Sequence, residues 1–251
     1  MPDFRVHAPH ALPDAAEILL GADESHHLVA VNRCSRGDPV IAFDGRGREW
    51  RCECLDPAKN GARLRVHATL QAQPLPHAIT LAQALPKGAT MDEIVRQATE
   101  LGAARIVPLL TERTQVHLDG ERAEKKVEKW RTTAIEAAKQ CGNPWVPEIA
   151  PVQRLDTFLT AQAASHELRL VASLHAGTRS LREVVAHYRA HHPRPPRSAL
   201  WLVGPEGDFS PTEMTACITA GCAPVTLGPL VLRCDTAAIA ALSVLAHELS
   251  T

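Results

Sequence analysis

The pattern of hydrophobic and polar positions changes in character near residue 70. Before that point, short apolar runs alternate with turn residues such as Gly37-Asp38 and the DGRG run at 44–47, which is typical of a small β-barrel. Residues 25–31 are expected to form one short helix capped by Asp23 or Ser25. The predicted strands of this part cover residues 18–20, 40–43, 50–55 and 62–70.

A linker follows at 71–76, where two prolines interrupt any periodic pattern. Beyond it, the hydrophobic pattern changes. Buried strand-like runs alternate with one-faced helical patterns, and Gly102 ends the first of these helices. This alternation of strands and helices predicts an α/β domain over residues 77–251, preceded by the β-barrel domain over residues 1–72. The expected strands are 78–85, 106–110, 168–173, 199–203 and 223–226, and the expected helices are 91–101, 121–140, 181–189 and 237–248.

Two loops in the last quarter of the chain each follow an apolar run and lead into a helix. They read GPEGDFSPTE at 204–213 and LGPLVLRCDTAA at 227–238. Because ligands bind at strand ends in open α/β sheets, both are candidate ligand loops, although the same spacing suits ordinary strand-to-helix turns. Neither loop matches the dinucleotide or P-loop pattern, so phosphate cradling is not expected.

Both loops also carry signals for the start of a helix. Ser210, Pro211 and Glu213 fit a capping box with proline at the first helical position, so a helix is expected to begin there. After the second loop, Asp235 or Thr236 is expected to cap the helix that begins at residue 237.

Composition adds expectations about compartment and metals. The 251-residue chain has no apolar run of eighteen residues and no signal-peptide core, so we expect a cytoplasmic protein without a membrane span. Seven cysteines without a CxxC pair argue against a disulfide framework, and Cys52 and Cys54 are expected to be buried on one face of a strand. The histidine-rich run at 187–197 lacks a second ligand cluster, so we expect a basic, proline-stiffened loop there and no metal site.

Charge is distributed unevenly, although the net charge is only −1. Residues 33–65 carry eight basic residues against five acidic ones, which suits a face that grips an RNA backbone and also a solvated barrel surface. In the predicted helix 121–140, basic residues are interleaved with acidic ones, which favours a solvated face over an RNA contact. The candidate RNA-binding residues in the first region are Arg33, Arg36, Arg46, Arg48 and Arg51.

These motifs resemble those of a known family. GPEGDFSPTE followed by LGPLVLRCDTAAIAAL is similar to the two carboxy-proximal motifs of the RsmE family, the bacterial small-subunit rRNA uridine-N3 methyltransferases of the SPOUT superfamily. The resemblance extends over nearly the whole chain. It includes Lys87-Gly88, the ELG run at 100–102, residues 130–140, the HHL run at 26–28, Arg33 and Gly37-Asp38.

The resemblance implies a SPOUT methyltransferase domain with a trefoil knot, preceded by a PUA-like RNA-binding domain. It implies S-adenosylmethionine (SAM) as methyl donor, the small ribosomal subunit and its 16S rRNA as substrate, and a homodimer. SAM is then expected where three loops converge. The implied cofactor-binding residues are Leu174, Gly204, Pro205, Glu206, Gly207, Leu227, Gly228, Val231, Leu232 and Thr236.

Methylation of uridine N3 requires removal of the imide proton and alignment of the nitrogen with the methyl group. Arg233 is the candidate for stabilising the developing uracil anion, and Asp235 or Glu206 is the candidate proton acceptor. Asp235 could instead cap a helix, and Glu206 could instead brace its loop with a hydrogen bond. The sequence departs from the commonest family pattern at Leu230 and Cys234-Asp235, which leaves the proton acceptor open.

Two other functions fit the same motifs. A SPOUT enzyme that methylates the ribose 2′-oxygen of RNA would place the methyl group on the sugar. A non-catalytic RNA-binding ribosome-assembly factor would keep the fold without turnover, and failure to bind SAM would favour this alternative.

Overall fold

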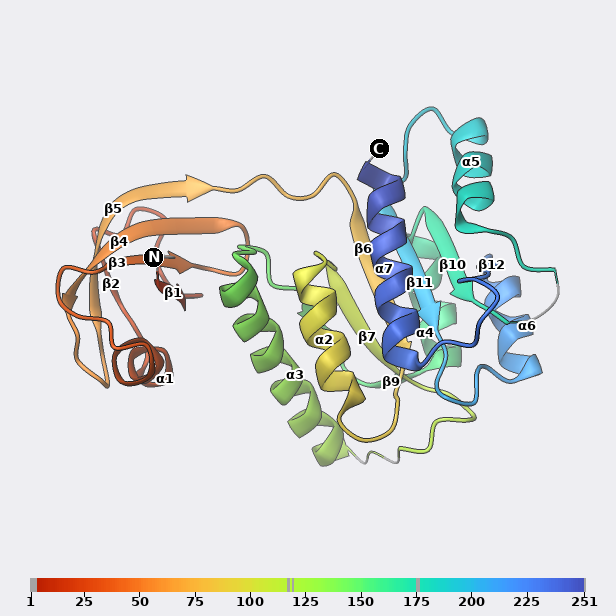
Figure 1. Cartoon of the computed structure of the whole chain (residues 1–251), viewed down its shortest axis with the longest axis horizontal. Coiled ribbons are helices and arrows are strands. Elements are labelled where there is room, and N and C mark those ends of the chain that lie inside the picture. Colours follow the sequence, from red (N-terminus) through yellow and green to blue (C-terminus); the bar gives the residue numbers. More distant parts are fainter. Residues whose placement is uncertain (1–3, 117, 119, 175–176, 251) are drawn as a thin grey trace. The chain divides into compact units, whose positions relative to one another are not determined.

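The computed structural model describes the chain except for residues 1–3, 117, 119, 175–176 and 251 (Figure 1). The chain forms two compact units. Unit 1 comprises Met1–Pro74 with Ile135–Val146, and unit 2 comprises Leu75–Ala134 with Pro147–Thr251. The segment Ile135–Val146 therefore belongs to the unit of the amino-terminal sheet, although it lies far along the chain from the rest of that unit.

Unit 1 is built on a five-stranded sheet in the order β1-β3-β4-β5-β2. β1 pairs with β3 in parallel, whereas the other pairs are antiparallel. The four strands expected from the sequence are confirmed, and β1 was missed because a four-residue segment shows too little alternation to stand out. The strands are β1 (Phe4–His7), β2 (Glu17–Leu19), β3 (Pro39–Phe43), β4 (Arg48–Asp56) and β5 (Arg63–Gln71).

Alternate residues of β4 supply the centre of the core of unit 1. Trp50, Cys52 and Cys54 face the same buried cluster as Leu28 and Leu64. The expectation that the two thiols share one buried face is confirmed. Burial raises the pKa of Cys52 to about 11, so this thiol behaves as a small apolar side chain.

The short helix is present, but its start differs from the expectation. α1 (Ala22–His26) continues directly into a π-helical turn, η1 (His27–Val31), and Asp23 and Ser25 both lie inside α1 rather than at its cap. Ser25 is fully buried, and its hydroxyl donates to the Gly21 carbonyl at 2.7 Å and accepts from the Ala62 amide at 2.9 Å. The side chain therefore links α1 to the start of β5, a tertiary role that no capping pattern could indicate.

Lys139 is an exception to the solvated face expected for the helix 121–140. Its ammonium is nearly buried in unit 1, at 3.0 Å from Glu24 Oε1 and 2.7 Å from Glu136 Oε1. Because a buried charge is tolerated only when it is paired, the two carboxylates account for the position of this lysine.

Unit 2 contains a seven-stranded sheet in the order β12-β10-β11-β6-β7-β8, and β9 also pairs with β7. All of these pairs are parallel. The five expected strands are confirmed, and two short strands of two residues each were missed. The strands are β6 (Ala78–Ala84), β7 (Arg105–Leu110), β8 (Glu148–Ile149), β9 (Gln153–Arg154), β10 (Leu168–Ala172), β11 (Ser198–Val203) and β12 (Ala223–Val225).

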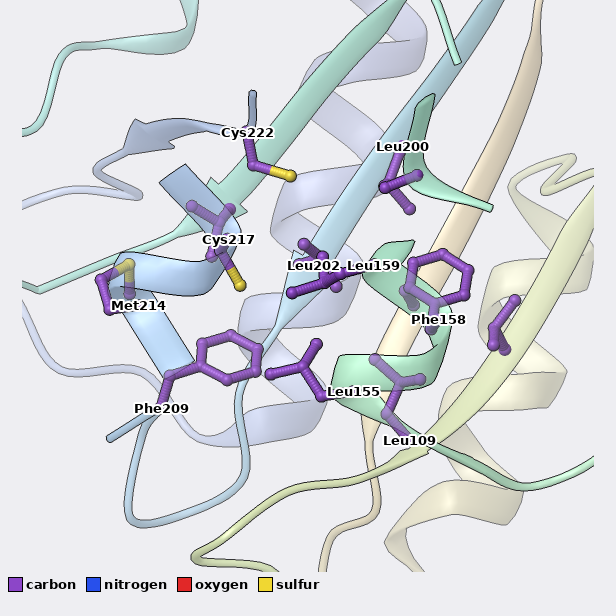
Figure 2. Close-up of a cluster of buried hydrophobic side chains, with 14 of the residues drawn as sticks. Leu109, Leu155, Phe158, Leu159, Leu200, Leu202, Phe209, Met214, Cys217 and Cys222 are labelled. Atoms are coloured by element: carbon purple, nitrogen blue, oxygen red, sulfur yellow. The ribbon is translucent and has the colours of Figure 1, made fainter. Parts of the chain in front are cut away.

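Helices cover both faces of this sheet. α7 packs on β6 and β11 and against α2, whereas α4 packs against α6 (Figure 1). Leu200 and Leu202 of β11 meet Phe158, Phe209 and their neighbours in one buried cluster (Figure 2). The helices are α2 (Thr90–Glu100), α3 (Gly120–Cys141), α4 (Leu155–Ala161), α5 (Leu181–His191), α6 (Pro211–Thr219) and α7 (Cys234–Ser250), with a 3₁₀ turn η2 (Ala163–Ser165).

Two helical segments of unit 2 differ from the sequence-based expectation. α4 was missed, because two turns beside short strands leave little periodic pattern. The run 187–197 was expected to be a loop, but its first five residues continue α5, and only the remainder is irregular. The capping box of Ser180 with Glu183 starts this helix, and Val184, Val185 and Tyr188 continue its buried face. Within the described residues, no helix combines the length and hydropathy needed to cross a bilayer.

We expect Gly47→Ala to destabilise unit 1 by at least about 3 kcal/mol. Gly47 has a φ of +91°, and a Cβ there would overlap the indole ring of Trp145. Gly37→Ala is the matched control, because Gly37 has a φ of +92° with nothing within 4 Å of its Cβ position, so strain alone should cost about 1 kcal/mol. Urea unfolding would measure both, and equal midpoints would contradict the proposed clash.

Candidate active site

A cavity of about 450 Å³ lies where three loops of unit 2 meet at the carboxyl ends of parallel strands. The first loop follows β10, the second follows β11, and the third joins β12 to α7 (Figure 1). The start of α2 contributes Thr90 to the same wall. Both ligand loops expected from the sequence therefore line one cavity.

Most of the residues proposed from the sequence lie on this cavity. The three candidate catalytic residues, Arg233, Asp235 and Glu206, all line it. Gly207, Gly228 and Thr236 are not among the lining residues. The proposed cofactor-binding residues that do line the cavity are Leu174, Gly204, Pro205, Glu206, Leu227, Val231 and Leu232.

The cavity also includes residues that sequence reasoning missed. Thr90 had no signal, because its place in the site depends on the packing of α2. Asp208, Leu230, Cys234 and Ala237 also line the cavity; they lie inside the two candidate ligand loops but were not among the named cofactor residues. Ala172, Ser173 and Val203 lie one or two residues before named positions.

Part of the cavity wall is apolar and open to solvent. Leu174, Leu230 and Val231 have exposed fractions of 58%, 72% and 79%. Exposed large apolar side chains gathered around one hollow indicate a surface that a ligand covers. The wall therefore suits a flat apolar group such as a nucleobase ring.

A tight turn shapes the loop after β11. Asp208 has a φ of +59°, and its amide donates to the Pro205 carbonyl at 2.9 Å. The Asp208 carboxylate accepts from the amide of Phe209 at 2.8 Å, and Phe209 is fully buried. A Cβ on Gly204 would lie 3.1 Å from Asp208 Oδ1, so glycine lets the chain fold back closely at this point.

The capping box after this loop is confirmed. The Ser210 hydroxyl accepts from the Glu213 amide at 3.3 Å, and Glu213 Oε2 accepts from the Ser210 amide at 3.0 Å. Pro211 occupies the first turn as expected. The turn thus passes directly into α6, which anchors one side of the cavity.

The start of α7 corrects the second capping expectation. The Arg233 carbonyl accepts from the Ala237 amide at 2.7 Å, and α7 begins at Cys234. Asp235 and Thr236 therefore lie within the first turn and do not cap the helix. The Asp235 carboxylate lies in the first turn of α7 and on the cavity wall.

Glu206 makes a hydrogen bond that matches the bracing alternative. Its Oε1 accepts from the main-chain amide of Lys87 at 2.9 Å. By contrast, the side chains of Arg233 and Asp235 form no hydrogen bond or ion pair with another described residue. Within the described part of the chain, both polar groups line the cavity without such a partner.

The candidate RNA-binding arginines lie in unit 1. Arg33, Arg36, Arg46 and Arg51 are exposed, whereas Arg48 is half-buried with its NH1 3.7 Å from Asp44 Oδ2. In unit 2, three basic residues of α3 pair with acids: Lys125 with Glu121 at 2.6 Å, Lys129 with Asp92, and Arg131 with Glu128. These pairs agree with the solvated face that the charge pattern of this helix favoured.

Aromatic rings at the end of α5 pack in two pairs. The rings of His187 and His191 lie 4.3 Å apart and are tilted, whereas those of Tyr188 and His192, the residue after α5, are stacked 3.9 Å apart. Among the described residues, no group of three or more histidine, cysteine or acidic side chains is arranged to hold a metal ion.

Two family models match the chain. One describes an RNA methyltransferase domain and matches residues 73–246, and the other describes an RNA methyltransferase PUA domain and matches residues 20–66. The ribosomal RNA small subunit methyltransferase E of Synechocystis is 34% identical over 236 residues, which cover 94% of this chain and 74% of that protein. The expected fold class, an α/β methyltransferase domain after a PUA-like domain, is confirmed.

Two solved structures are similar over almost their whole length. One is a putative methyltransferase from Legionella pneumophila in complex with bound SAM, which is 33% identical with a TM-score of 0.87. The similarity covers 98% of this chain and 97% of that one. The ribosomal RNA small subunit methyltransferase E from Neisseria gonorrhoeae, bound to SAM, is 25% identical with a TM-score of 0.85. The similarity covers 97% of this chain and 96% of that one.

We expect Cys234 to resist alkylation at pH 7.5, although it lies in the first turn of a helix. Burial, followed by the nearby Glu206 carboxylate, raises the pKa of its thiol to about 11 and outweighs the helix dipole. Fewer than about one molecule in a thousand then carries the thiolate. Exposed Cys141 is the internal comparison. Peptide mass spectrometry after iodoacetamide treatment should find Cys141 labelled first, and equal labelling would contradict the assigned burial.

Proposed function

This chain belongs to the ribosomal RNA small subunit methyltransferase E family, and we propose that it transfers a methyl group from SAM to N3 of a uridine in small-subunit rRNA. The observation that carries the proposal is the joint position of Arg233 and Asp235 on a cavity with an apolar wall. The RNA substrate is taken from the relatives, and uridine N3 from the resemblance of the two loop motifs.

The cavity residues fit SAM. The volume of about 450 Å³ is in the range of small-molecule sites, and the wall of Leu174, Leu230 and Val231 suits an adenine ring. The glycine-containing turn at 204–208 lets main-chain groups approach a ligand closely. Bound SAM would supply an electrophilic methyl group on a sulfonium. The residues proposed to hold it are those of the three converging loops, including Gly204, Leu227 and Leu232.

Asp235 is the better of the two candidate proton acceptors. Three carboxylates line the cavity, but those of Glu206 and Asp208 accept main-chain amides. These two carboxylates hold the main chain of the loop, so a role as proton acceptor would compete with that structural contact, whereas Asp235 has no such contact with a described residue. In the proposed reaction, uridine N3 loses its proton to Asp235 and bonds to the methyl carbon, while the carbon–sulfur bond breaks and the electron pair stays on sulfur.

Arg233 is proposed to stabilise the uracil anion as the proton leaves. Its guanidinium is exposed at the cavity and keeps its donors available in the described part of the chain. A positive group placed where negative charge develops lowers the barrier without reorganisation. Orientation of the base by the same residue would add to this effect.

The two parts of the chain are proposed to have separate tasks. Residues 1–72 would form the PUA-like RNA-binding domain, with Arg33, Arg36, Arg46, Arg48 and Arg51 contacting phosphates, and residues 77–251 would carry the methyltransferase site. We further propose the trefoil knot and the homodimer that the resemblance implies, and the cytoplasmic location expected from composition. The assembled small subunit is the proposed form of the substrate.

The purified protein should methylate small ribosomal subunits isolated from a strain that lacks the corresponding gene. With labelled SAM, nucleoside mass spectrometry is expected to find 3-methyluridine, and subunits that already carry the modification should accept no label. A ribose-methylated product would identify the 2′-O alternative. Absence of SAM binding would favour the non-catalytic assembly factor.

Arg233→Ala should lower the rate of methyl transfer by about 100-fold or more, because a donor to the developing anion is lost. The affinity for SAM, measured by calorimetry, should change by less than about threefold, since the uracil-facing charge is not a proposed SAM contact. Arg233→Lys keeps a positive charge and should recover part of the rate. Unchanged turnover in the alanine variant would remove Arg233 from the mechanism.

A further inference from the structure

The loop at 204–208 is held by residues that do not line the cavity. On one side, the Lys87 amide, in the loop after β6, donates to Glu206 Oε1 at 2.9 Å. On the other, Arg113 NH1, in the loop after β7, donates to the Gly207 carbonyl at 2.6 Å. Neither Lys87 nor Arg113 is among the cavity-lining residues. The two contacts therefore hold the tip of the loop from outside the ligand site.

Arg113 also packs along the loop with its aliphatic stem. A Cβ on Gly207 would lie 3.3 Å from both Cβ and Cδ of Arg113, which is closer than ordinary van der Waals contact. Glycine at this position thus allows the arginine stem to lie against the main chain. The hydrogen bond from a charged guanidinium to a carbonyl is stronger than one between neutral groups.

The segment that carries Arg113 is itself fixed. The Glu112 amide donates to Glu213 Oε1 at 2.7 Å, and Glu213 is the capping-box residue of α6. The Thr114 hydroxyl accepts from the Thr111 amide at 3.1 Å. Because its own loop is anchored to α6 and closed on itself, Arg113 can restrain the neighbouring loop rather than follow it.

We propose that Lys87 and Arg113 form a loop clamp, acting on Glu206 and Gly207, that keeps the cofactor loop in its binding-competent form. Arg113 is then a positioning residue, and Glu206 holds the loop through its carboxylate rather than accepting the substrate proton. A loop held in the bound conformation loses less freedom on binding, so the clamp raises affinity for the ligand. The link to SAM rests on the proposed function, whereas the effect on the loop does not.

Hydrogen exchange of the ligand-free protein tests the clamp directly. The amides of Asp208 and Phe209 are hydrogen-bonded within the loop and report its opening. Arg113→Ala should speed their exchange roughly ten- to hundredfold, and Arg113→Lys, which can still donate to the carbonyl, should speed it less. The control is Arg154→Ala, because exposed Arg154 pairs with Asp156. Wild-type exchange in Arg113→Ala would overturn the proposal.

Two Glu206 variants separate the hydrogen bond from the charge. Glu206→Gln keeps an oxygen that can accept the Lys87 amide, so loop exchange should stay within about twofold of wild type, whereas Glu206→Ala should speed it roughly tenfold or more. Equal exchange in all three proteins would overturn this half of the clamp.

Calorimetry with SAM then links the clamp to the proposed function. Arg113→Ala should weaken SAM binding about tenfold, because the loop must be ordered on binding. If the wild type binds SAM and Arg113→Ala binds it equally well, the link between clamp and cofactor fails while the proposed function stands. If the wild type does not bind SAM, the proposed function fails, and the exchange experiment still decides whether the clamp exists.

Discussion

The parallel arrangement of the sheet in unit 2 is the constraint on which the candidate site depends. Parallel strands end at the same edge, so the loops after β6, β7, β10, β11 and β12 all emerge together. Three of these loops form the cavity, and the other two supply the clamp. Arg113 and Gly207 are separated by 94 positions in the chain, and Lys87 and Glu206 by 119. These pairs can meet only because their loops emerge at this shared edge.

Gln83 connects the sheet directly to the cavity loop at 204–208. It is fully buried at the end of β6, opposite Val203 of β11 in the parallel register. Its side-chain amide donates to the Ala84 carbonyl at 2.8 Å and lies 3.3 Å from the Gly204 carbonyl. The Gln83 side chain therefore connects β6 to the first residue of the loop at 204–208.

Local signals in the sequence were sufficient where local physics decides the structure. The Ser210 capping box and the alternating burial of Cys52 and Cys54 depend on neighbours in the chain, and both were predicted correctly. The start of α7 was predicted three residues too late, because Asp235 and Thr236 are good capping residues in isolation and nothing local shows that the Arg233 carbonyl already accepts the first helical bond. Capping propensity shows only that a residue is able to cap a helix. The surrounding fold decides whether it lies at the cap or within the first turn.

The roles of the site residues were harder to predict than their location. Glu206 and Asp235 are both carboxylates in cavity loops, and no pattern distinguishes them. The distinction depends on the Lys87 amide, which comes from another loop and engages only Glu206. Arg113 was not considered at all, because a single arginine after a strand carries no signal without its distant partner.

The distribution of charge supports the proposal that the two units have different tasks, RNA binding in unit 1 and methyl transfer in unit 2. Three basic residues of α3 are paired with acids. By contrast, Arg33, Arg36, Arg46 and Arg51 of unit 1 are exposed, without a side-chain ion pair in the described part of the chain. A basic side chain that already pairs with an acid gains little binding free energy from a phosphate, because it would give up that pair. An unpaired one can displace counterions from an RNA backbone. The net charge of −1 thus conceals an uneven distribution of charge, which supports the proposal that unit 1 contacts the RNA backbone while unit 2 carries the residues proposed for methyl transfer.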